Sequence, residues 1–75
     1  MTKDIVAPPG GVMTDEVGVV TGDLTLATDV NDDGVITLRV QYKGADEWYT
    51  VTDAQVKPEP AKRAAAERAL LNRFG

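Results

Sequence analysis

The chain has 75 residues, a formal net charge of −4 and no cysteine or histidine, which is the profile of one small domain without a disulfide or an imidazole or thiolate metal site. Residues 1–16 lack the apolar block of a signal peptide, and no apolar run is long enough to cross a membrane. We therefore expect a cytoplasmic or virion protein with no membrane contact and no cofactor. Its packing, or a partner, must supply the stability that such a short chain lacks.

Charge is unevenly distributed along the chain. Residues 1–56 carry three basic and ten acidic side chains, a net charge of −7, whereas residues 57–75 carry five basic and two acidic ones, a net charge of +3. An acidic body repels a phosphate backbone, which disfavours nucleic-acid binding through that part of the chain. The basic tail either complements the acidic body or contacts a nucleic acid itself.

The first fifteen residues contain the run Pro8-Pro9-Gly10-Gly11 among small and polar residues. This composition is typical of segments without a regular element. We expect residues 1–15 to form a flexible arm that is dispensable for folding. Residues 16–75 would then form the single β-rich domain.

Residues 17–52 alternate β-branched and aromatic residues with Gly- and Asp-containing turns, which predicts four short antiparallel strands. The first strong turn signal is Asn31-Asp32-Asp33-Gly34, a type I turn with its glycine in the left-handed region as a bulge. This turn predicts that Val30 lies opposite Ile36, and Leu26 opposite Val40.

Two further turns begin with glycine, as two-residue hairpin loops often do. The Gly44-Ala45 loop predicts that Val40 lies opposite Tyr49, and that Gln41, Arg39 and Leu38 lie opposite Trp48, Thr50 and Val51. The Gly22-Asp23 loop predicts that Val19 lies opposite Leu26.

The three turns place the same side chains on one face, and agreement among independent turns supports the register. The predicted apolar face consists of Val17, Val19, Leu24, Leu26, Val30, Ile36, Leu38, Val40, Tyr42, Tyr49 and Val51. The opposite, mostly polar face consists of Val20, Thr25, Thr37, Arg39, Gln41, Trp48 and Thr50.

A helix is predicted from about residue 60 to residue 74, after Lys57-Pro58-Glu59-Pro60 ends the last strand. Its large apolar residues are Leu70, Leu71 and Phe74, which can cover the apolar sheet face. The predicted fold is therefore α+β: a four-stranded antiparallel meander, either an open sheet or an SH3-like small barrel, capped by one C-terminal helix.

The stretch Asp29–Ile36 matches the first eight positions of an EF-hand calcium loop, with oxygen ligands at Asp29, Asn31 and Asp33. The match fails at the twelfth position, where Val40 replaces the bidentate carboxylate. Such a site would bind a cation only weakly. A bulged hairpin turn requires the same polar residues without any metal, so we predict no metal site.

Catalytic constellations cannot be assembled from this composition, because the chain also lacks serine. The adjacent acidic pairs Asp15-Glu16 and Asp46-Glu47 are expected to be solvated at loop margins. We therefore expect a protein without enzymatic activity.

The predicted register places Trp48 beside Arg39 and Gln41 on the polar face. Tryptophan and arginine are enriched at binding hot spots, so these three residues form the predicted partner-binding surface. An ordinary cross-strand stack of Arg39 on Trp48 would explain the same arrangement.

We expect a protein-protein interaction or structural accessory module, such as a phage or bacterial accessory factor, an inhibitor or a virion protein. The alternatives are an SH3-like module that binds nucleic acid or nucleoprotein through its basic helix, and a weak calcium-binding module. The partner's identity and the oligomeric state stay open.

Overall fold

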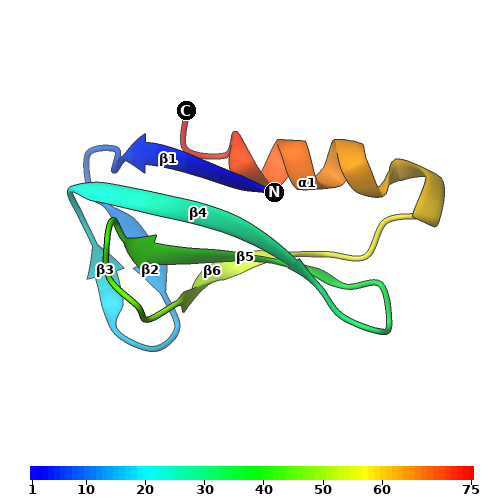
Figure 1. Ribbon diagram of the computed structural model, residues 1–75, viewed down its shortest axis with the longest axis horizontal. Coiled ribbons are helices and arrows are strands. Elements are labelled where there is room, and N and C mark those ends of the chain that lie inside the picture. Colours follow the sequence, from blue (N-terminus) through cyan, green and yellow to red (C-terminus); the bar gives the residue numbers. More distant parts are fainter.

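The computed structural model describes residues 1–75 and shows an α+β fold with one antiparallel sheet and one C-terminal helix (Figure 1). The sheet has six strands in the order β1-β4-β5-β6-β2-β3 and does not close into a barrel. The four-stranded meander and the barrel alternative are therefore wrong. The elements are β1 Thr2–Val6, β2 Val12–Thr14, β3 Gly18–Val20, β4 Asp23–Val30, β5 Ile36–Tyr42, β6 Tyr49–Val56, a 3₁₀ turn Pro60–Lys62 and α1 Arg63–Leu71.

The hairpin of β4 and β5 has the register that its turn predicts. Val30 lies opposite Ile36 and Leu26 opposite Val40. The Asn31 side-chain oxygen accepts hydrogen bonds from the backbone N–H groups of Asp33 and Val35, at 2.9 and 3.0 Å. Gly34 has φ +82° in the left-handed region, as the bulge requires. The turn is thus determined by its own side chains.

The hairpin of β5 and β6 follows the prediction in its middle pairs and departs from it both at the loop and farther along. Val40 lies opposite Tyr49 and Arg39 opposite Thr50, as expected. The tight turn itself is Tyr42–Ala45, closed by a 2.9 Å bond from the Ala45 N–H to the Tyr42 carbonyl, and not a two-residue loop.

A bulge in β6 then replaces the predicted pairing of Leu38 with Val51. The register shifts between Thr37 and Arg39, so that Thr37 lies opposite Gln55. Asp53 has φ +57°, which is the left-handed region that bulged strands often use. Nothing in the composition of residues 51–54 signals this irregularity.

The N-terminal residues supply the two strands that the sequence did not predict. β1 pairs with β4, and β2 pairs with β3. The expectation that residues 1–15 form no regular element is therefore wrong, as is the Gly22-Asp23 hairpin with Val19 opposite Leu26. Gly22, at φ +84°, carries the chain from one strand pair to the next, and its carbonyl accepts the Ala7 N–H at 2.9 Å.

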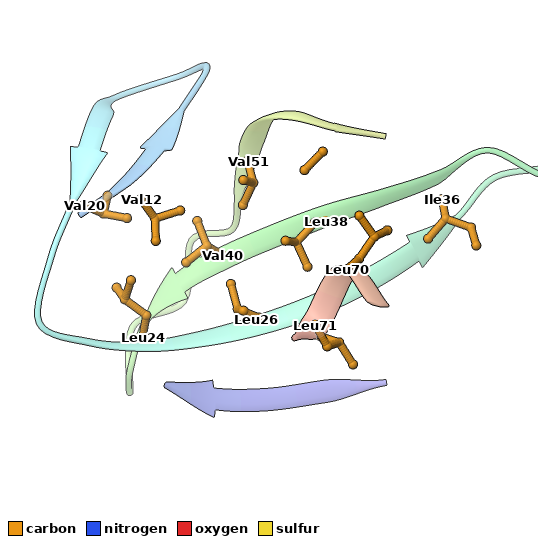
Figure 2. Close-up of a cluster of buried hydrophobic side chains, with 11 residues drawn as sticks. Val12, Val20, Leu24, Leu26, Ile36, Leu38, Val40, Val51, Leu70 and Leu71 are labelled. Atoms are coloured by element: carbon orange, nitrogen blue, oxygen red, sulfur yellow. The ribbon is translucent and has the colours of Figure 1, made fainter. Parts of the chain in front are cut away.

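The core lies between the sheet face and two separate covers (Figure 2). Val12 and Val20 from the β2–β3 hairpin lie near Leu24 and Val40 at one end of that face. At the other end α1 packs on β4 and β5 and contributes Leu70 and Leu71. The complete buried apolar set is Val12, Val20, Leu24, Leu26, Ile36, Leu38, Val40, Val51, Ala54, Leu70 and Leu71.

Several side chains differ in burial from the prediction. Val20 is buried although it was placed on the polar face, and Val17, Val19, Val30 and Tyr42 are exposed. The errors at Val19 and Val20 follow from the wrong partner for β3, since a change of partner changes which side chains face the core. Val30 and Tyr42 are the last residues of β4 and β5.

The C-terminal helix is confirmed as a cover of the core. Leu70 and Leu71 are buried, and Phe74 packs against the cluster while half-buried. The structure contains no helix with the length and apolar character needed to cross a membrane.

We predict that a chain beginning at Thr14 is less stable than the full chain by more than about 2 kcal/mol, the contribution of one large buried apolar side chain. The deletion removes β1 and the fully buried Val12. Urea unfolding of the two chains measures the difference. As a control, Met13→Ala should change stability by less than about 0.5 kcal/mol, because that side chain is exposed. An unchanged unfolding midpoint after the deletion would restore the flexible-arm interpretation.

Candidate functional site

Three of the four aromatic residues of the chain lie between positions 42 and 49, at the connection from β5 to β6. Tyr42 is 42% exposed and Trp48 is 40% exposed, and Tyr49 is half-buried. Large aromatic side chains held partly in solvent are the residues that most often dominate binding at protein interfaces. This segment is therefore the strongest candidate site in the chain.

Tyr49 is the inward-facing member of the three. It packs against the core, and its hydroxyl donates a hydrogen bond to the Glu47 carboxylate at 3.0 Å. This bond raises the pKa of Tyr49 above its ordinary value, because it stabilises the protonated hydroxyl. Glu47, expected to be fully solvated, thus has a structural role.

Arg39 lies on the predicted face of the sheet, but other side chains occupy its guanidinium. Its Nη2 lies 3.3 Å from Asp29 Oδ2, and its Nη1 donates to Thr50 Oγ1 at 2.8 Å. The only arginine within reach of an aromatic ring is Arg73, 5.9 Å from the centre of Phe74. The stacking of Arg39 on Trp48 is therefore not observed.

Gln41 also makes an internal bond. Its side-chain nitrogen donates to the Ala45 carbonyl at 2.8 Å, so the amide closes the turn at the end of β5. Trp48 precedes the first residue of β6 and has no strand partner, so the predicted pair of Gln41 and Trp48 does not form. Of the three predicted partner-binding residues, Trp48 alone has no hydrogen bond or ion pair within the chain.

The turn between β2 and β3 is held by hydrogen bonds against the start of β6, next to Trp48 in the sequence. The Glu16 carboxylate accepts the Thr50 N–H at 2.8 Å and the Thr50 hydroxyl at 2.9 Å. The Asp15 N–H donates to the Thr50 carbonyl at 3.0 Å, and Asp15 Oδ1 accepts the Thr52 hydroxyl at 2.6 Å. Sequence reasoning missed this junction, because the acidic pair could be recognised only once the strand beside it was known.

The hydrogen bonds at this junction change the acidity of Glu16. The Thr50 backbone N–H, which donates to the carboxylate, is the largest cause that lowers the pKa of Glu16 below its ordinary value of 4.5. The Thr50 hydroxyl and the Arg39 charge act in the same direction. The ionised form is therefore the one that holds the turn against β6.

Further exposed apolar side chains lie on the β2–β3 hairpin, whose turn is hydrogen-bonded to Thr50, two residues after Trp48. Met13 and Val19 lie directly opposite each other, and Val17 lies in the turn that Glu16 fastens. All three are about half exposed. Exposed apolar groups gathered in one region are more informative than single ones, because they mark interaction surfaces.

Two of the three candidate oxygen ligands of the calcium-like turn, those of Asn31 and Asp29, are bonded within the protein, and Asp33 is exposed. Asn31 Oδ1 accepts two backbone N–H groups, and the Asp29 carboxylate pairs with Arg39. The structure contains no cluster of three or more His, Cys, Asp or Glu side chains that could hold a metal ion. The polar residues of this turn are explained by its hairpin geometry.

Two of the basic side chains of the C-terminal segment lie against the acidic body. Arg73 Nη1 donates to the Asp53 carbonyl at 2.9 Å. Arg63 lies so close to Gly34 that a Cβ there would come within 3.2 Å of its Nη2. The basic segment therefore does not present all of its cations on one outward face.

We predict that Glu16→Gln weakens the fold at pH 7, and that the difference from the natural chain shrinks as the pH falls below about 4.5. Glu16 has a lowered pKa in the folded state, so its stabilisation is present above 4.5 and is lost as the pH falls through the lower folded value. Urea unfolding between pH 7 and pH 3 measures both effects. A stability difference that stays constant over this range would show that the Glu16 carboxylate does not hold the turn.

No protein-family model, no curated protein and no solved structure matches this chain.

Proposed function

We propose that the chain is a non-catalytic module that binds another protein through Trp48 and the exposed apolar side chains next to it. The observation that carries the proposal is the position of Trp48. This side chain is 40% exposed, has no strand partner and lies at the end of a rigid strand that is fastened on both sides. A large aromatic residue on a rigid support binds with a small loss of conformational entropy.

The neighbours of Trp48 extend the surface that a partner would cover. Tyr42 is exposed on the other side of the loop, and Met13, Val17 and Val19 are exposed on the adjoining hairpin. Arg39 and Gln41 support the strands in this proposal and do not contact the partner, because their polar groups already have acceptors. A role as a phage, bacterial or virion accessory factor, or as an inhibitor, fits such a module.

The test places a photo-crosslinking amino acid at position 48 and, in a separate variant, at position 65 on the exposed side of α1. In cells of the native host, the position 48 variant should form a covalent adduct with one discrete protein, and the Ala65 variant should not. Added natural chain should compete for that adduct. Trp48→Ala should compete about thirtyfold less well, since loss of a hot-spot tryptophan costs about 2 kcal/mol.

Stability measurements separate binding from folding. Trp48→Ala should leave the unfolding midpoint nearly unchanged, whereas Tyr49→Ala should lower it, because Tyr49 packs against the core. Equal adducts from positions 48 and 65, or an adduct with nucleic acid, would contradict the proposal. A collapse of the fold by Trp48→Ala alone would show that Trp48 is a core residue.

A further inference from the structure

The outer edge of β1 carries backbone groups that no other strand satisfies. β1 is the first strand of the sheet and pairs only with β4. The Thr28 N–H donates to the Met1 carbonyl, and the Ala7 N–H donates to the Gly22 carbonyl, so residues 1 and 7 face β4. Because the backbone direction alternates along a strand, residues 3 and 5 also face β4. The N–H and C=O groups of Thr2, Asp4 and Val6 therefore point away from the sheet.

The side chains along this edge are open to an incoming chain. Thr2, Asp4 and Val6 are exposed, and Val6, at 72%, is the most exposed large apolar side chain of the protein. A row of outward N–H and C=O groups beside an exposed valine is the arrangement to which an added β-strand pairs. The other free edge, β3, has only three residues and offers far fewer such groups.

The charges along β1 disfavour a second copy of the same chain as the occupant. Antiparallel self-pairing through all three outward residues would place Asp4 opposite Asp4 of the second copy. A shift toward the N-terminus would place Lys3 opposite Lys3, and like charges in directly opposed positions destabilise a strand pair. A shift the other way would bring in Pro8, which has no N–H to donate.

A basic residue in the incoming strand would complement this edge. The Asp4 carboxylate accepts the Thr25 hydroxyl at 2.8 Å and lies 3.7 Å from Lys43 Nζ. Asp4 is thus held in place on an exposed face of a body whose first 56 residues carry a net charge of −7. An opposed Lys or Arg pairs favourably with such a carboxylate across two strands.

We propose that the β1 edge binds an extended segment of a partner protein, which adds antiparallel to β1 with a Lys or Arg opposite Asp4 and an apolar residue opposite Val6. This site is separate from Trp48, so either surface can be tested without the other. The sheet would gain a seventh strand. Backbone pairing would supply affinity, and the residue opposite Asp4 would supply selectivity.

The experiment uses the full ¹⁵N-labelled chain and two capped seven-residue peptides made of Val and Thr, one with Lys and one with Glu at its centre. The Lys peptide should shift the amide resonances of Thr2, Asp4 and Val6 and should bind more tightly than the Glu peptide. Val6→Pro should weaken binding by more than about tenfold, because it removes an outward N–H and leaves the β1–β4 bonds intact. Asp4→Lys should reverse the preference between the two peptides, and Asp33→Lys, an equal charge change in an exposed turn, should not.

Four results would overturn the proposal. The first is that no resonance of β1 shifts at millimolar Lys peptide. The second is that the shifts lie elsewhere, for example at Trp48. The third is that the Asp4→Lys chain still prefers the Lys peptide. The fourth is that the Thr2, Asp4 and Val6 resonances move with protein concentration alone, which would make a second copy the occupant.

Discussion

The length of the apolar face of β4 and β5 is the constraint on which the rest of the fold depends. β4 has eight residues and at about 3.3 Å per residue extends roughly 26 Å, whereas the nine residues of α1 extend only about 14 Å. One helix cannot cover such a face, so a second cover is needed at the other end. Val12 and Val20 of the β2–β3 hairpin provide it.

This second cover determines where the candidate binding groups lie. To reach the core, the hairpin must lie against β6, and Glu16 fastens it there through Thr50. The same junction leaves Trp48 in solvent at the end of a supported strand. β1, which leads into the hairpin, pairs with β4 on one side and remains open on the other. Folding and the two proposed surfaces thus follow from one packing requirement.

Local chemistry could be predicted from the sequence, and long-range pairing could not. The Asn31 turn forms as predicted because its own side chain accepts the backbone groups that define it. The Gly22 turn was mispredicted because a glycine suits both a hairpin turn and a connection between two strand pairs. Which of the two forms depends on the pairing of β4 with β1, more than fifteen residues away. For the candidate site, the alternation of side chains along the predicted strand placed Trp48 outside the core, where it is exposed. The pairing of Arg39 with Asp29 depends on neighbouring strands, which this alternation does not specify. The mismatch between a long apolar face and a short helix was a usable signal for a second cover.

Amide hydrogen exchange along residues 1–7 tests most directly whether the N-terminal segment belongs to the sheet. Membership of the sheet predicts an alternating pattern. The amides of Lys3 and Ile5 are protected by bonds to β4 and that of Ala7 by its bond to the Gly22 carbonyl, whereas those of Thr2, Asp4 and Val6 exchange rapidly at the open edge. Rapid exchange at all of these amides would contradict it and would return the segment to a flexible arm.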